Sequence, residues 1–271
     1  MYNYSILNVL SFLTFIQFVL ISLLEINRKK KIVRHLFSIS LFLTFISYSF
    51  FTLFLLLNHE SNYLSLILYL TLVIILFIYF ACCMLDFSFV RLRFFFIPYF
   101  LFFIPICKSS IYLNKNINFY DLSFYENKLL SLHIIISLLS YSFLTVSSIS
   151  STAVLFQQRN LKLVLKRKIN FFNSLPSIYE GEKITIRLLI TTQFFLLMSL
   201  VTGFYYHKSL LYYQNFFSNE KFLLSTVTFL LICVLLLIRY FFGLTGKKIF
   251  SFVLLSFLFI NIAYFGLKFT N

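Results

Sequence analysis

The chain has 271 residues, of which 61% are hydrophobic and only 11% are charged, and its formal net charge is +15. Soluble domains are typically about 45–50% apolar and about 25% charged, so this composition excludes an ordinary soluble fold. We expect an all-α membrane protein, because long continuous apolar segments favour transmembrane helices over the short alternating segments of a transmembrane barrel.

Apolar segments of membrane-spanning length follow one another along the whole chain. Roughly 20 helical residues cross a hydrocarbon core of about 30 Å. Eight segments meet this length: Tyr4–Leu24, Leu36–Leu57, Tyr63–Leu85, Phe94–Leu113, Leu129–Phe156, Ile184–Tyr206, Phe222–Phe242 and Ile249–Leu267. Their connections are short for independent folding. We therefore predict a single integral membrane domain over residues 1–271, built as a bundle of eight transmembrane helices.

Lys and Arg residues are concentrated in alternate connections, at 28–34, 91–93, 157–187 and 239–248. The positive-inside rule places such connections in the cytoplasm. It therefore predicts that both termini lie on the periplasmic side of a bacterial inner (plasma) membrane, and we expect a Gram-negative source. The same rule explains the net positive charge, so we expect the lipid bilayer, and no nucleic acid, as the partner of these residues.

His133 is the best candidate for chemistry, since ionisable residues inside membrane spans are costly and often functional. It lies one turn inside the fifth segment, where small and polar residues recur at helical spacing. This stripe comprises Ser137, Ser140, Tyr141, Ser147, Ser148 and Ser151. Such a stripe either lets another helix approach closely or lines a cavity.

The sixth segment carries a matching face, formed by Thr192, Ser199, Gly203, Tyr206 and His207. We predict that the fifth and sixth helices pack through these two faces. His207 ends the sixth helix on the outer side, and His59 lies in the outer connection after the second helix. Two histidines on facing helices could hold haem iron as axial ligands, although a histidine at a helix end is also common as a simple interfacial residue.

The sequence lacks the motifs of several common enzyme classes. The chain has no phosphate-binding loop, no H-E-x-x-H sequence and no nucleophile elbow, and we assign no catalytic residue. All carboxylates fall at the ends of the segments or between them, which disfavours a proton-coupled transporter. Two alternatives remain open: a transporter or modulator of ion efflux, and a structural scaffold for other membrane proteins that binds no haem.

The second half of the chain, from about residue 129 to 271, resembles the cytochrome c assembly protein family. Within that family it is most similar to the HemX-like and YpjD-like inner-membrane branch. The resemblance rests on the order and spacing of six stretches: Leu129–Leu144, Gln157–Lys162, Pro176–Lys183, Leu200–His207, Gly243–Lys248 and Ala263–Lys268. It implies eight spans and haem handling at the outer face, linked to cytochrome c maturation and its other maturation proteins.

The resemblance also has implications for the residues that would bind haem iron. His133 matches the family's histidine at the start of the fifth span, which implies an axial haem ligand, and we take His207 as the candidate for the second axial ligand. The chain contains no Trp and so lacks the tryptophan-rich segment of the haem-delivering members. Glu220 stands where many relatives have a histidine before the seventh span. The implied role is therefore haem binding or assembly assistance.

Overall fold

The computed structural model describes residues 2–24, 31–57, 63–113, 128–164, 175–209, 220–242 and 247–264. These residues are almost entirely α-helical and include no strand, which confirms the all-α prediction. Clustering of backbone contacts divides the chain into two compact units, Met1–Ser123 and Phe124–Asn271. That residues 1–271 form a single membrane domain remains a prediction.

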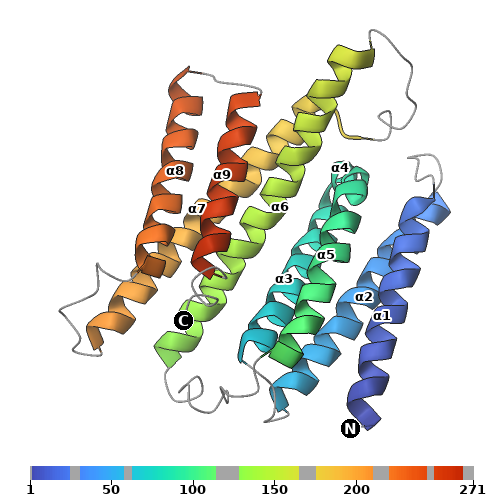
Figure 1. Ribbon diagram of the computed structural model, residues 1–271. Helices are drawn as coiled ribbons and strands as arrows, with labels where there is room; N and C mark the ends of the chain where they lie inside the picture. The colour runs from blue at the N-terminus through green and yellow to red at the C-terminus, as the bar shows by residue number, and fades with distance from the viewer. Residues whose placement is uncertain are drawn as a thin grey trace. The chain divides into compact units, whose positions relative to one another are not determined.

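The described residues of unit 1 form four long helices and one short one. The helices are α1 (Tyr2–Leu23), α2 (Lys31–Leu57), α3 (Tyr63–Leu85), α4 (Phe87–Arg91) and α5 (Arg93–Leu113). α1 and α3 each pack against both α2 and α5 (Figure 1). Aromatic rings connect neighbouring helices, with centroid distances of 5.7 Å for Phe18–Phe37, 4.9 Å for Phe51–Tyr69 and 3.8 Å for Tyr79–Phe96.

Arg93 corrects an expectation from the sequence, which placed it in a cytoplasmic connection. It is the first residue of α5 and only 2% exposed. Its guanidinium donates from Nε to the Ser22 carbonyl at 2.8 Å and from Nη2 to the Leu24 carbonyl at 3.3 Å. The last carbonyls of a helix lack partners within that helix, and basic side chains are able to supply them. Arg93 therefore caps the C-terminal end of α1.

In unit 2 the part of the chain that the structure describes forms α6 (Lys128–Val164), α7 (Ile178–Ser209), α8 (Glu220–Phe242) and α9 (Lys247–Tyr264). α6 packs along α7 over the most extensive interface of the unit, and α9 packs against both α6 and α8. α8 also contacts α7 (Figure 1). α6 and α7 are 37 and 32 residues long, so both exceed the length needed to cross a bilayer.

The N-terminal end of α7 lies six residues before the predicted start of the sixth span. The Ser177 hydroxyl accepts a hydrogen bond from the Glu180 backbone at 3.2 Å, and the Glu180 carboxylate accepts one from the Ser177 backbone at 3.1 Å. This reciprocal pair is a capping box, which satisfies two backbone donors at a helix start. The capping box explains why the helix begins at Ile178 and includes the charged residues that follow.

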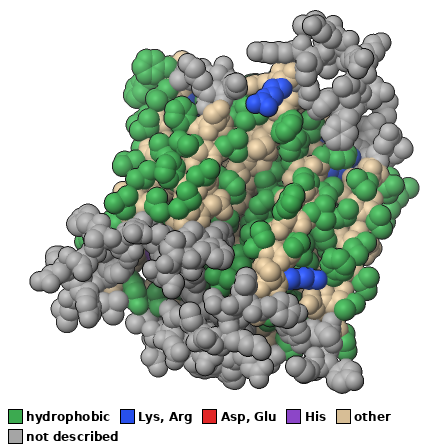
Figure 2. Space-filling model, in the orientation of Figure 1, with side chains coloured by type: hydrophobic (Ala, Val, Ile, Leu, Met, Phe, Trp, Pro, Cys, Tyr) green, Lys and Arg blue, Asp and Glu red, His purple; other side chains and the backbone are tan. Residues whose placement is uncertain are grey.

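Within the described residues, seven helices are long and apolar enough to cross a membrane, which makes the chain a multi-pass membrane protein. The apolar part of α9, Ile249–Ala263, is shorter than the others. The structure thus supports seven of the eight predicted spans, and the eighth remains a prediction. Figure 2 shows hydrophobic side chains over most of the described surface in that view, as expected for helices that face lipid.

Candidate functional site

His133 lies in the second turn of α6 and its ring faces α7. Its Nδ1 atom lies 3.0 Å from the Ser199 carbonyl oxygen and 3.2 Å from the Thr202 hydroxyl. The side chain is half-buried. A carbonyl oxygen only accepts hydrogen bonds, so Nδ1 must carry the proton. In the neutral ring, Nε2 is then the nitrogen with the lone pair.

Gly203 lies beneath the imidazole of His133. A Cβ atom added at position 203 would be 3.0 Å from Cε1, 3.4 Å from Nδ1 and 3.6 Å from Nε2. The absence of a side chain therefore allows the ring to lie against the α7 backbone. The prediction that His133 and Gly203 belong to facing helix surfaces is confirmed.

The same helix pair stays in close contact toward the N-terminal end of α7. Ser147 donates to the Thr185 carbonyl at 3.3 Å, and Ser150 donates to the Gly181 carbonyl at 3.3 Å. The Thr185 hydroxyl lies 3.0 Å from that of Ser150. Small residues at these positions let the two backbones approach, as is common between helices in membranes.

Part of the predicted α6 face points elsewhere. The Tyr141 hydroxyl donates to Asn261 Oδ1 at 2.9 Å, and the Ser151 hydroxyl donates to the Phe250 carbonyl at 3.1 Å. Both partners belong to α9. Because successive residues turn by about 100° around a helix of 3.6 residues per turn, a stripe this wide reaches two neighbouring helices. The polar stripe therefore joins α6 to α9 as well as to α7.

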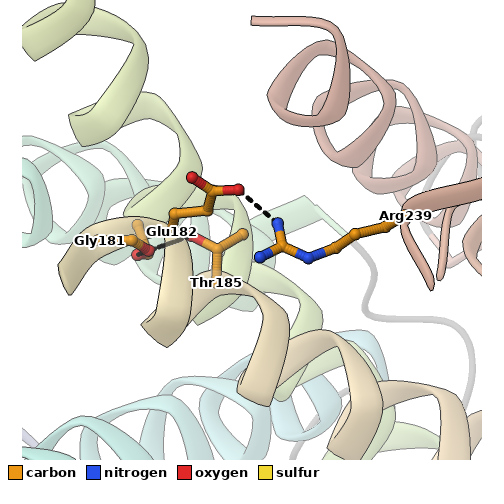
Figure 3. A network of polar contacts seen from close by, with 5 residues as sticks. Gly181, Glu182, Thr185 and Arg239 are labelled. Carbon is orange, nitrogen blue, oxygen red and sulfur yellow. Dashed lines mark hydrogen bonds and ion pairs between the residues drawn. The ribbon is translucent and has the colours of Figure 1, made fainter. Parts of the chain in front are cut away.

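A second polar cluster joins α7 to α8. Arg239 Nη1 donates to Glu182 Oε1 at 2.5 Å, and the two side chains are 27% and 11% exposed (Figure 3). Thr185, one turn along α7, donates to the Gly181 carbonyl at 2.8 Å. The sequence interpretation placed Arg239 at the basic end of the seventh segment and Glu182 before the start of the sixth, and it predicted no contact between them. In the structure both lie within helices and form a partly buried ion pair.

Within the described part of the structure, no other histidine side chain is seen at this site. His207 belongs to the last turn of α7, four residues after Gly203, but its side chain lies outside the described part of the structure. His59 also lies outside the described residues, and His35 is an exposed residue of α2 in unit 1.

A family model described as Cytochrome C assembly protein matches residues 4–271. The chain belongs to the cytochrome c assembly protein family. The match covers nearly the whole chain, so it extends well before Leu129, where the resemblance in the sequence became strong. Comparisons with curated proteins and with solved structures gave no match.

Family membership and the apolar helices together make the chain an integral membrane protein of the cytochrome c assembly type. Haem handling is consistent with that family. In this cytochrome c assembly protein, sequence reasoning found His133, Ser199 and Gly203 but missed Thr202. A signal was available, because Thr202 follows Ser199 by three residues and so lies on the same helix face.

Proposed function

We propose that the protein binds haem at the end of unit 2 that carries His133 and takes part in cytochrome c assembly there. The observation that carries this proposal is the pair of contacts from Nδ1 of His133 to the Ser199 carbonyl and the Thr202 hydroxyl. Histidines that bind metals almost always donate their other ring N–H to a carbonyl or carboxylate. His133 has this arrangement, with Nε2 as the nitrogen able to bind iron.

The chemistry around His133 also suits a porphyrin. Leu129 and Leu132 flank it on α6 and are 47% and 48% exposed, so they offer apolar surface beside the ring. Among the described residues, no group of three or more His, Cys, Asp or Glu side chains could hold a metal ion. A haem iron needs only one or two axial ligands, because the porphyrin supplies the rest. Bound haem would supply the Lewis-acidic iron that accepts the imidazole nitrogen.

His207 is the second axial ligand in this proposal. Its position follows Gly203 by four residues, which places it one turn further along the same face of α7. The family's association with haem supports both assignments. The proposed partners are haem, the surrounding lipid and other cytochrome c maturation proteins.

We place the protein in the bacterial inner membrane, with both termini on the periplasmic side and the His133 end of unit 2 at the outer face. The basic connections support this orientation through the positive-inside rule. An even number of spans requires α9 to cross the membrane. With 18 described residues, α9 is about 27 Å long, close to the hydrocarbon thickness of about 30 Å.

Haem titration of the purified protein in detergent tests the proposal. The wild type is expected to give a Soret band that saturates at one haem per chain. His133→Ala is expected to abolish or shift this band, and His207→Ala to change it to a smaller extent. His35→Ala is the matched control, since this exposed histidine lies in unit 1. Absence of haem binding in the wild type, or an identical spectrum for His133→Ala, would refute the proposal.

A further inference from the structure

Three features of one α7 turn lie against the His133 ring: the Ser199 carbonyl, the Thr202 hydroxyl and the absence of a side chain at Gly203, where a Cβ atom would be 3.0 Å from Cε1. We infer that Thr202 and Gly203 are positioning residues, which hold the imidazole in the Nδ1–H form and so select Nε2 as the iron-binding nitrogen. This inference rests on the proposed haem function, but its structural part is testable without haem.

The Nδ1 proton of His133 and the hydrogen bonds of Thr202 within α7 together determine the direction of the contact between the two side chains. Its hydroxyl lies 2.9 Å from the Met198 carbonyl and 3.0 Å from the Ser199 carbonyl. Because the Ser199 carbonyl already requires the proton on Nδ1, the single hydroxyl proton of Thr202 is donated to one of these two carbonyls and not to the ring. The Thr202 oxygen then has only lone pairs to offer His133 and accepts a hydrogen bond from Nδ1–H. Ser199 and Thr202 therefore act on Nδ1 in the same sense, as two acceptors.

Two acceptors at one nitrogen favour a single tautomer. The alternative form, with the proton on Nε2, would direct the Nδ1 lone pair at the Ser199 carbonyl oxygen 3.0 Å away. Two lone pairs facing each other without a proton repel, and buried polar atoms without a partner are costly. Thr202 adds a second contact to the ring from a side chain, which is open to substitution, whereas the Ser199 carbonyl belongs to the backbone.

Gly203 determines how closely the His133 ring can approach the α7 backbone. An alanine Cβ would lie 3.0 Å from Cε1, which is tighter than an ordinary van der Waals contact. The ring would have to shift by a few tenths of an ångström to accept it. Such a shift would alter the distances from Nδ1 to Ser199 and Thr202 together, and with them the direction of Nε2. The glycine therefore accommodates the close approach of the ring at this position.

Nitrogen NMR of histidine-labelled protein without haem tests the tautomer directly. The wild type, with His133 assigned by comparison with His133→Ala, is expected to show a protonated Nδ1 and an unprotonated Nε2. Thr202→Val removes one acceptor and should raise the fraction of the Nε2–H form, whereas Thr202→Ser should restore the wild-type spectrum. Thr191→Val is the matched control, because this α7 hydroxyl bonds to the Leu188 carbonyl of its own helix.

Haem titration of the same variants tests the consequence for the ligand. Loss of a residue that orients a metal ligand typically weakens metal binding by about 10–100-fold. We expect Thr202→Val and Gly203→Ala to weaken haem binding by at least about 10-fold, with Thr202→Ser and Thr191→Val close to the wild type.

The outcomes separate the two proposals. If His133→Ala abolishes haem binding while Thr202→Val and Gly203→Ala bind haem as the wild type does, the positioning roles are wrong and the haem function stands. A wild-type spectrum with the proton on Nε2 also overturns them. If His133→Ala leaves haem binding unchanged, the haem function fails, and Nε2 has no iron to bind whatever the tautomer.

Discussion

Gly181 on α7 lies so close to Val154 on α6 that a Cβ atom added to the glycine would overlap Cγ2 of the valine. The Ser150 hydroxyl reaches the Gly181 carbonyl at the same point of contact. α6 and α7 are thus in close approach near the N-terminal end of α7, and the contact between His133 and Gly203 repeats this relationship near the other end.

Substitution of Gly181 by alanine is predicted to destabilise unit 2. Extra atoms in a packed interface typically cost about 1–3 kcal/mol, because neighbours must shift to accept them. Thermal unfolding in detergent measures the effect, with Ile190→Ala as the control, since Ile190 is exposed on the same helix. In the double variant Gly181→Ala/Val154→Ala the penalty should be partly relieved, because the overlapping Cγ2 methyl group of Val154 is gone. Strictly additive effects of the two substitutions would contradict this prediction.

The ion pair between Glu182 and Arg239 is predicted to stabilise the contact of α7 with α8. Removing one partner of a fully buried pair typically costs about 3–5 kcal/mol. Both side chains retain some exposure, so we expect about 1–2 kcal/mol for Glu182→Gln or Arg239→Gln. The double variant should cost less than the two single variants added together. Lys183→Gln, an exposed neighbour, serves as the control. Additive losses would show that the pair contributes no coupling.

Arg93 is predicted to be the most sensitive basic residue of unit 1. Arg93→Met would leave the Ser22 and Leu24 carbonyls without their charged donor, at a cost of about 2–4 kcal/mol in unfolding free energy. Arg93→Lys keeps the charge but lacks the forked guanidinium, so it should recover only part of the loss. Arg34→Met is the control: Arg34 is exposed and lies 5.5 Å from the Phe87 ring centroid, a contact worth about 0.5–1 kcal/mol. Equal stability of Arg93→Met and Arg34→Met would refute the capping role.

The orientation of the chain is predicted to place both termini outside the cytoplasm. A periplasmic alkaline phosphatase fused after Asn271 should therefore be active, and a fluorescent protein fused there should stay dark. Fusions after Lys168, in a basic connection, should give the opposite pattern. If the fusions after Lys168 and after Asn271 were both fluorescent, α9 would not cross the membrane and the number of spans would be odd.

The sequence alone was sufficient to predict the helices and the placement of His133 opposite Gly203, because both depend on local patterns. Hydropathy predicted the apolar segments, and a 3.6-residue period placed His133 and Gly203 on facing surfaces. Arg93 and the Glu182–Arg239 pair could not be predicted in this way. Their contacts join residues 71 and 57 positions apart, and a basic residue near a span end has the same local signature whether it is buried or meets lipid headgroups.

The start of α7 was only partly predictable from the sequence. The Ser-x-x-Glu pattern at 177–180 is visible in the sequence, yet hydropathy alone placed the helix start at Ile184, because the intervening charged residues lower the average. Thr202 was overlooked for a similar reason: a threonine among apolar residues carries no charge, and its role depends on what the facing helix presents.

The capping of α1 by Arg93 has a consequence for biogenesis. Synthesis proceeds from the N-terminus, and the donor for the Ser22 carbonyl is encoded 71 residues later. When α1 leaves the ribosome, that end of the helix must rely on water or lipid headgroups. The nascent first helix acquires its permanent donor only after α5 has been made and inserted, so a chain truncated before residue 93 leaves α1 without it.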